Sequence, residues 1–105
     1  MNRQELLERV KSRLKDAFGE RLKGIILYGS EARGEADPDS DIDLLVLLES
    51  QESYWSDVRL CIHVLYPIVL ENDGRPIHAY PVTVEEYQAQ EWPLYQAVKE
   101  EGVPV

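Results

Sequence analysis

The stretch of residues 24–48, GIILYGSEARGEADPDSDIDLLVLL, contains two apolar runs separated by small and polar residues. The first run, residues 24–28, is rich in isoleucine and leucine and predicts a buried strand. The second run, residues 41–48, is apolar at most positions and predicts a central strand. Residues 30–40, which include Pro38, are typical of a short helical turn followed by a loop. The sequence therefore predicts two strands joined by a short helical connection.

Gly29 and Ser30 follow the first predicted strand directly. Glycine allows the backbone to approach a ligand closely, and backbone N–H groups at such a turn favour an anion such as a phosphate. The hydroxyl of Ser30 can donate a hydrogen bond to a phosphate oxygen. Both are candidate phosphate-binding residues. For Arg33 two interpretations stay open, namely a phosphate contact or brace for the loop, and a salt bridge to a nearby carboxylate.

Asp41 and Asp43 are separated by one residue in the second predicted strand. Because alternate residues of a strand point to the same face, we expect both carboxylates to project together. They lie among apolar residues, where an unpaired charge is costly, so they need a compensating cation. Oxygen ligands of this kind select Mg²⁺ or Mn²⁺. A phosphate-binding turn beside such a metal site predicts phosphoryl or nucleotidyl transfer.

These two motifs, GSEARG at residues 29–34 and SDIDL at residues 40–44, together resemble the signature of the DNA polymerase beta-like nucleotidyltransferase superfamily. With 105 residues, the chain is similar to a minimal nucleotidyltransferase, the stand-alone domain often encoded beside a HEPN-domain protein. The resemblance covers nearly the whole chain. Its signature is highly specific, whereas the C-terminal part, including residues 92–95, is only loosely similar to the family.

The resemblance implies a nucleotidyltransferase α/β core. Gly29 and Ser30 would hold the triphosphate of ATP, while Asp41 and Asp43 would bind Mg²⁺, so that a nucleoside monophosphate passes to an acceptor and pyrophosphate leaves. In paired systems such a domain is the antitoxin of a HEPN ribonuclease toxin, which it neutralises by adenylylation or, alternatively, by binding alone. Transfer to a small molecule such as an aminoglycoside is disfavoured, because the chain leaves little room for a second substrate domain.

Catalytic members of the superfamily carry a third carboxylate on a neighbouring strand. The corresponding predicted strand here, residues 77–82, contains no acidic residue, and His78 stands near the expected position. An imidazole is a poor ligand for Mg²⁺ but tolerable for Mn²⁺, and it can accept a proton near neutral pH. His78 is otherwise an ordinary half-exposed strand residue. Without a third acid, nucleotide binding without turnover is the alternative outcome.

Outside these motifs the sequence predicts mainly helices. Apolar periodicity predicts a helix over residues 3–18 and another over residues 54–70, broken or kinked near Pro67. His63, within the second of these, is predicted to be a partly buried structural residue. Two short helices are expected at the C-terminal end, one after the N-cap Thr83 and one over residues 93–101. The fold class is therefore α/β, as a single domain of residues 1–105 with a small sheet of about three strands.

The distribution of charge along the chain indicates which binding partners are favoured. The net charge is −9, with seven basic and four acidic residues in residues 1–24 but three basic and ten acidic in residues 49–105. Tight binding of nucleic acid needs a basic stripe and is disfavoured, whereas the acidic part suits a basic protein partner in a hetero-oligomer.

The single Cys61 excludes an internal disulfide and is expected to be a small buried residue. With no membrane segment and no signal peptide evident, we expect a cytoplasmic protein.

Overall fold

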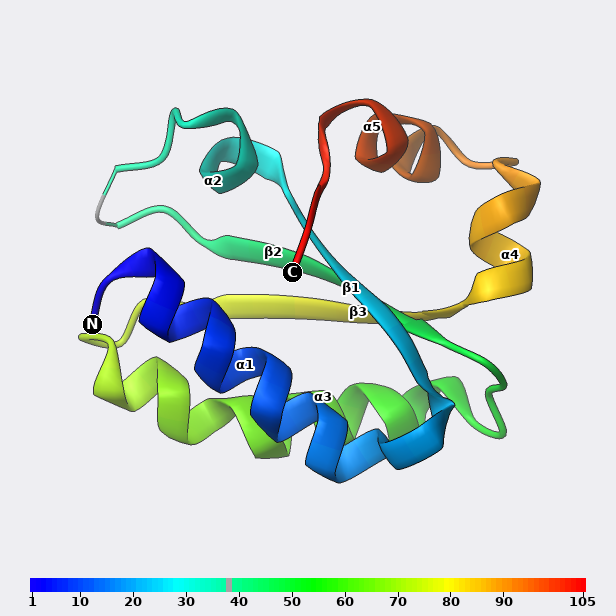
Figure 1. Cartoon of the computed structure of the whole chain (residues 1–105), viewed down its shortest axis with the longest axis horizontal. Helices are drawn as coiled ribbons and strands as arrows, with labels where there is room; N and C mark the ends of the chain where they lie inside the picture. The colour runs from blue at the N-terminus through cyan, green and yellow to red at the C-terminus, as the bar shows by residue number, and fades with distance from the viewer. Residues whose placement is uncertain (38) are drawn as a thin grey trace.

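The computed structural model describes residues 1–37 and 39–105, and Pro38, expected in the loop before the second strand, lies outside this set. The chain alternates between helices and strands, as Figure 1 shows. In order, the elements are α1 (Arg3–Phe18), the 3₁₀ turn η1 (Gly19–Arg21), β1 (Leu22–Tyr28), α2 (Gly29–Arg33), β2 (Ile42–Leu48), α3 (Tyr54–Glu71), β3 (Ile77–Thr83), α4 (Val84–Ala89), α5 (Pro93–Glu101) and β4 (Val103–Pro104).

The strands form one mixed sheet with the order β3-β2-β1-β4. β2 pairs antiparallel with β1 and parallel with β3. In the described part of the chain the sheet has four strands, one more than predicted. The additional strand, β4, has only two residues and pairs antiparallel with β1 at the edge of the sheet. A two-residue strand that contains a proline gives no periodic signal, and an edge is where a strand tolerates proline.

Helices cover both faces of the sheet (Figure 1). α1 and α3 lie side by side on one face, and α2, α4 and α5 lie on the other. The larger core fills the α1/α3 side, and its fully or nearly fully buried members include Val10, Leu14, Leu27, Leu44 and Ile68. A smaller cluster of Leu45, Val82 and Val98 lies on the opposite face. The two sides of β2 are thus both apolar, as expected of a central strand.

The two long helices begin and end where local signals place them. The side chain of Asn2 accepts a hydrogen bond from the backbone of α1, and the helix ends at Gly19, whose φ is +59°. Ser53 caps the start of α3 in the same way. α3 is continuous across Pro67, so of the predicted break or kink the structure excludes the break. Burial of Leu65 and Ile68 on either side of the proline holds the helix in place.

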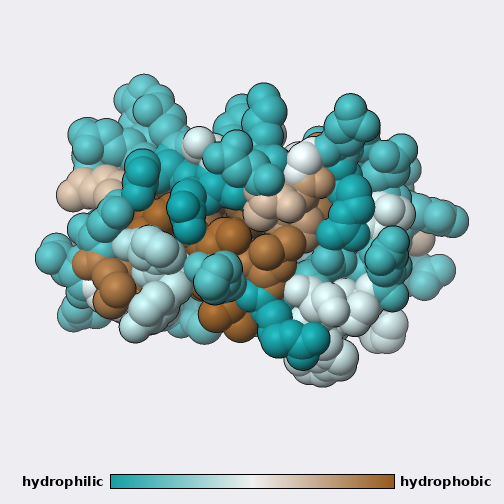
Figure 2. All heavy atoms as spheres, turned by 90° about the horizontal axis from the view of Figure 1, so that it is seen from below, coloured by the Kyte–Doolittle hydropathy of each residue, from teal (hydrophilic) through white to brown (hydrophobic). Residues whose placement is uncertain are grey.

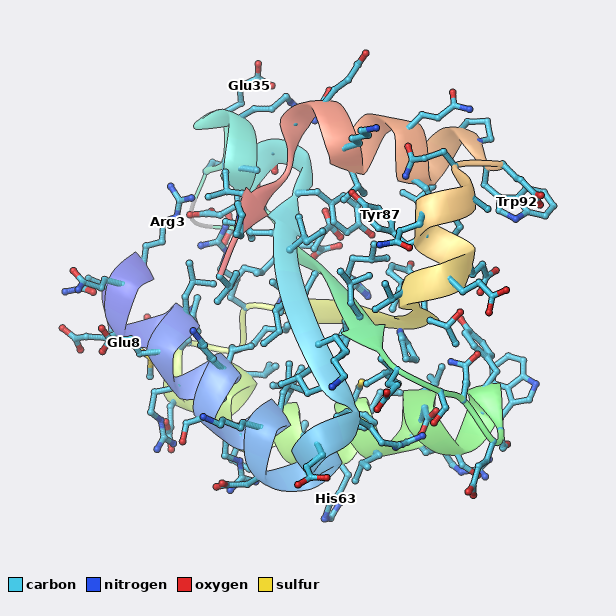
Figure 3. The ribbon with its side chains drawn as sticks, turned by 45° about the vertical axis from the view of Figure 1, so that its right-hand side comes forward. Arg3, Glu8, Glu35, His63, Tyr87 and Trp92 are labelled. Carbon is cyan, nitrogen blue, oxygen red and sulfur yellow. The ribbon has the colours of Figure 1, made fainter. Side chains whose placement is uncertain are left out.

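Two side chains of α3 test the predicted burial. Cys61 is buried, as expected, and this burial raises the pKa of its thiol to about 12. His63 was expected to be partly buried, but it is exposed and points away from the molecule (Figure 3). The helix packs on one face only, and His63 lies outside that face.

None of the helices in the described part of the chain combines the length and apolar character needed to cross a membrane.

Candidate active site

The candidate site lies at the N-terminal end of β2, on the face of the sheet that carries α2, α4 and α5. Along β2 the side chains alternate, so that Leu44 joins the core under α1 and α3 while Leu45 joins the small cluster on the other side. Asp43 shares a face with Leu45 and is half-buried. In register it pairs with Tyr28 of β1 and with His78 of β3. Neighbouring strands therefore bring three polar side chains together at this point.

Gly29 joins β1 to α2 and touches Asp43. Its φ is +73°, a conformation that favours glycine. A Cβ atom added to Gly29 would lie 2.6 Å from Oδ2 of Asp43, so a side chain at this position would displace this carboxylate. Ser30 follows as the second residue of α2 and is half-buried. The structure thus brings the Gly29 turn and Asp43 together, while phosphate binding by Gly29 and Ser30 stays a prediction.

Asp41, Asp43 and His78 form the chemical centre of the site. Oδ2 of Asp41 lies 3.0 Å from Nε2 of His78, and both side chains are about half exposed. Partial burial raises the pKa of the Asp43 carboxyl above its ordinary value, the charge of a protonated His78 lowers it, and Asp41 raises it. Among the described residues, Asp43 forms no side-chain hydrogen bond or ion pair. The most buried carboxylate of the site is therefore without a cationic partner.

Tyr28 closes one side of this site. It is half-buried beside Asp43 and pairs with it across β1 and β2. Burial, followed by the negative charge of Asp43, raises the pKa of the Tyr28 hydroxyl above its ordinary value. The hydroxyl therefore stays protonated and is available as a hydrogen-bond donor at neutral pH.

Arg33, at the end of α2, is engaged by two carboxylates. Its Nε atom donates to Glu35 and its Nη1 atom donates to Glu101, each at 3.0 Å. Of the two interpretations of this residue, the structure contains the salt bridge. The positive charge of Arg33 also lowers the pKa of Asp43, so the guanidinium lies within electrostatic reach of the site. A phosphate contact would require Arg33 to exchange these partners and stays a prediction.

Arg75 is a residue of the site region that sequence reasoning missed. Its Nη2 atom donates to Glu31 of α2, and its Nε atom donates to the backbone carbonyl of Ser40, directly before Asp41. The side chains of Arg75 and Glu31 are only 16% and 15% exposed. Glu31 is thus held in an ion pair. Arg75 ties the helix after the glycine turn to the segment that enters β2, and no local pattern could have revealed this contact.

The donor set at the site fits a hard divalent cation that also binds phosphate. Within residues 1–37 and 39–105, no group of three histidine, cysteine or acidic side chains is arranged to hold a metal ion. Mg²⁺, however, is commonly held by one or two carboxylates together with substrate phosphates and water. Asp41 and Asp43, side by side with Asp43 lacking a cationic partner, match this requirement.

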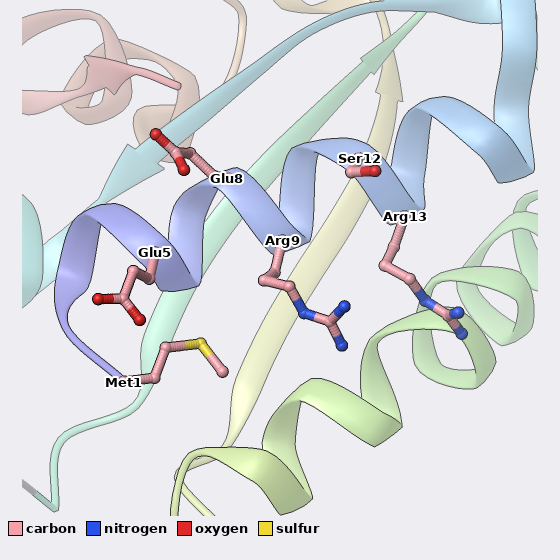
Figure 4. A pocket seen from close by; sticks show the side chains of 6 residues that line it. All are labelled: Met1, Glu5, Glu8, Arg9, Ser12 and Arg13. Atoms are coloured by element: carbon pink, nitrogen blue, oxygen red, sulfur yellow. The ribbon is translucent and has the colours of Figure 1, made fainter.

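A hollow of about 580 Å³ along α1 is a separate feature (Figure 4). Its six lining residues include Arg9 and Arg13, and none of them is a candidate site residue. Both Arg9 and Arg13 point toward α3, where Arg9 donates to the two carboxylate oxygens of Glu71 at 2.8 Å and Arg13 donates to the Val64 carbonyl at 2.9 Å. These guanidinium groups serve helix packing, so the hollow lacks the free cations that a nucleotide site would need.

The structure thus places paired carboxylates at the start of the central strand of a mixed α/β sheet, beside a glycine turn. The sequence model of the nucleotidyltransferase domain family matches residues 4–105. A protein of Methanocaldococcus jannaschii named "Putative protein adenylyltransferase" is 30% identical over 103 residues, which are 97% of this chain and 96% of that protein. The chain therefore belongs to the nucleotidyltransferase domain family.

Solved structures agree with this assignment. One described as a "putative minimal nucleotidyltransferase" has a TM-score of 0.64 and 25% identity, and the match covers all of this chain and 97% of that chain. A toxin-antitoxin structure with AMP-PNP has a TM-score of 0.65 and 20% identity, and the match covers 92% of this chain and 69% of that chain. The resemblance to minimal nucleotidyltransferases and the α/β fold class are thus both confirmed.

Proposed function

We propose that this chain transfers AMP from ATP to a protein, and that the acceptor is a HEPN ribonuclease toxin whose antitoxin it is. The observation that carries the proposal is the grouping of Asp41, Asp43 and His78 at one end of β2 and β3, against the Gly29 turn. The toxin-antitoxin structure with AMP-PNP and the M. jannaschii relative named for protein adenylylation support the choice of nucleotide and acceptor. The acidic C-terminal part suits a basic, RNA-cutting partner in a cytoplasmic hetero-oligomer.

In the proposed reaction, Gly29 and Ser30 position the triphosphate through the backbone and a hydroxyl. Asp41 and Asp43 would hold Mg²⁺, which supplies charge neutralisation at the phosphate oxygens. The acceptor hydroxyl oxygen attacks the α-phosphorus of ATP. The bond from this phosphorus to the oxygen that bridges the α- and β-phosphates then breaks, and pyrophosphate leaves with that electron pair.

His78 takes the third position of the site. Its Nε2 atom is 3.0 Å from Asp41, so a neutral imidazole that donates Nε2–H to this carboxylate presents Nδ1 as an acceptor. In our proposal Nδ1 of His78 accepts the proton that the attacking hydroxyl loses. Asp41 then orients the ring through this contact.

A second candidate function is neutralisation of the same partner by binding alone. The observation that favours it is that the β3 residue in register with Asp43 is a histidine, where catalytic relatives are expected to have an acid. In this case nucleotide binding persists without turnover, and the acidic surface alone accounts for complex formation.

The test is the intact mass of a catalytically inactive HEPN partner after incubation with this chain, ATP and Mg²⁺. Transfer adds about 329 Da for each adenylyl group. The Asp41→Asn/Asp43→Asn double variant should form the complex but add no mass. A matched double variant, Asp16→Asn/Glu20→Gln, makes the same change of charge at two exposed positions outside the acidic C-terminal part and away from the site, and should retain transfer.

The two candidate functions give opposite outcomes in this experiment. A mass gain that the Asp41/Asp43 double variant abolishes supports adenylylation. An intact complex without mass gain, and full neutralisation of the toxin by the double variant, would replace it with the binding antitoxin. No complex with the HEPN partner would reject the partner itself.

A further inference from the structure

The outer surface of α3 is apolar where a helix on the protein surface is normally polar. Its core side buries Cys61, Leu65 and Ile68. The opposite side carries large side chains that are mostly exposed, namely Trp55 at 67%, Ile62 at 63%, Tyr66 at 57% and Leu70 at 60%. At roughly 100° per residue, these four residues and Arg59 fall within a stripe about 80° wide, pointing away from the core. We call this stripe, together with His63, the α3 face.

Such a continuous apolar surface differs from the scattered exposed side chains of ordinary monomers. Figure 2, which views the molecule from the side of α1 and α3, shows apolar side chains gathered in a band among hydrophilic ones. An open groove of about 490 Å³ lies on the α3 face and is lined by Arg59, Ile62, His63, Tyr66 and Pro67. The helix is thus apolar on both sides, which is the pattern of a helix that is covered on both sides.

The charges on the α3 face fit a second copy of the same chain. The chain has a net charge of −9, so most of its surface repels another copy. Between Trp55 and Leu70, however, the single acidic residue is Asp57, which is buried and paired with Arg21 at 2.7 Å. The α3 face therefore exposes no carboxylate over four turns of helix.

We propose that two copies of this chain associate through their α3 faces, with the two α3 helices antiparallel about a two-fold axis between Ile62 and His63. In a two-fold interface, residue i contacts residue j and residue j contacts residue i. The α3 face meets this condition, because each of its residues has a second residue of the face at the same distance on the other side of the axis. Trp55 lies opposite Leu70 of the other copy, Arg59 lies opposite Tyr66, and Ile62 lies opposite His63.

One of these pairs is electrostatically favourable. Arg59 is the cation of the α3 face, and the two-fold axis brings it over the ring of Tyr66, an arrangement that attracts a guanidinium. The two Arg59 side chains stand on opposite sides of the axis, about 10 Å apart along the helices, because each is 3.5 residues from the centre. Within the α3 face no like charges meet across the axis.

The exposed area is sufficient for a small dimer interface. A fully buried aromatic side chain contributes 150–250 Å², so Trp55 and Tyr66 at about two-thirds exposure offer roughly 250 Å² together. Ile62, Leu70 and the flanking groups bring the total to about 500 Å² per copy. Specific interfaces begin near 1,000 Å² for both partners together. We therefore expect a weak dimer, with dissociation in about the micromolar range.

The experiment measures the mass of the purified chain in solution by light scattering, at concentrations from about 1 to 100 μM, around the expected dissociation constant. We expect the mass to rise from 12.1 kDa toward twice that value. Ile62→Glu, at an exposed position on the axis, should hold the chain at the monomer mass without unfolding it. The control Trp92→Glu places the same charge at an exposed aromatic on the α5 side and should dimerise normally.

A cross-linking variant tests the geometry directly. Ile62→Cys places one thiol of each copy next to the two-fold axis and should form an intermolecular disulfide under mild oxidation. Trp92→Cys should not, and the native Cys61 is buried. A monomer at all concentrations overturns the proposal, as does a dimer that Ile62→Glu leaves intact. A monomeric chain whose complex with a protein partner is lost in Ile62→Glu would assign the α3 face to that partner instead. None of these outcomes depends on nucleotidyl transfer.

Discussion

Nε2 of His78 and Oδ2 of Asp41 lie 3.0 Å apart, although the two residues are 37 positions apart in the sequence. The parallel pairing of β2 with β3 creates this contact, because it places His78 in register with Asp43, two residues after Asp41. The position where relatives are expected to have a third acid thus carries an imidazole that is oriented by one of the two carboxylates.

His78→Ala tests the proposed role of this imidazole as proton acceptor. We expect kcat for AMP transfer to fall about 100-fold, the lower range for loss of a general base, with little change in KM for ATP. His63→Ala removes an exposed imidazole away from the site and should keep the full rate. An unchanged kcat in His78→Ala would show that the proton leaves by another route.

Gly29→Ala tests the contact between the turn and Asp43. Gly29 and Gly34 both have a φ of +73°, so alanine is strained at either position and should lower the free energy of unfolding by about 1 kcal/mol or more. A Cβ at Gly34 has nothing within 4 Å, whereas at Gly29 it meets Asp43. We therefore expect calorimetry to detect loss of Mg²⁺ and ATP binding in Gly29→Ala only. Equal binding in both variants would contradict this account.

Local pattern was sufficient to predict β1, β2 and β3 and the paired carboxylates. The residues on either side of the segment 29–41 form two nearly continuous apolar runs, which become β1 and β2. Asp41 lies directly before β2 and Asp43 within it, so the spacing of two residues was sufficient to predict that they are close together. The place of His78 was expected from the family resemblance, and the parallel pairing of β2 with β3 puts it in register with Asp43.

Contacts between distant segments were not predictable in the same way. Arg75 and Glu31 are 44 residues apart, and either could have been a solvated side chain. The continuity of α3 across Pro67 depends on tertiary packing that outweighs the local preference. β4 depends on a backbone pairing of two residues with β1. The apolar periodicity of the sequence does not predict any of these interactions.

Asp43→Asn should stabilise the protein in the absence of metal. Burial raises the pKa of Asp43 in the folded state, so the folded chain binds more protons than the unfolded chain between the ordinary and the raised value. Stability therefore falls as the pH rises through this window and stays lower above it. We expect thermal unfolding midpoints at neutral pH to be higher for Asp43→Asn than for the native chain, and to be equal at a pH below the window.

Mg²⁺ should reverse the order of the unfolding midpoints of Asp43→Asn and the native chain, because a cation at Asp43 favours the charged carboxylate. The unfolding midpoint of the native chain should rise with added Mg²⁺, whereas that of Asp43→Asn should not. Asp16→Asn, at an exposed position on α1, serves as the control and should respond to Mg²⁺ as the native chain does. A native midpoint that is insensitive to Mg²⁺ would contradict the assignment of Asp43 as a metal ligand.

Arg75→Met tests whether the tie between α2 and the start of β2 positions the site. Arg75 and Glu31 are largely buried, so loss of their ion pair should lower the free energy of unfolding by about 2 kcal/mol. Arg9→Met removes an exposed arginine–glutamate pair and should cost less than about 1 kcal/mol without affecting transfer. Because Arg75 also holds the carbonyl of Ser40, we expect its loss to displace Asp41 and lower kcat at least 10-fold, with partial rescue in Arg75→Lys. Loss of stability with a native kcat would make Arg75 a brace for the fold alone.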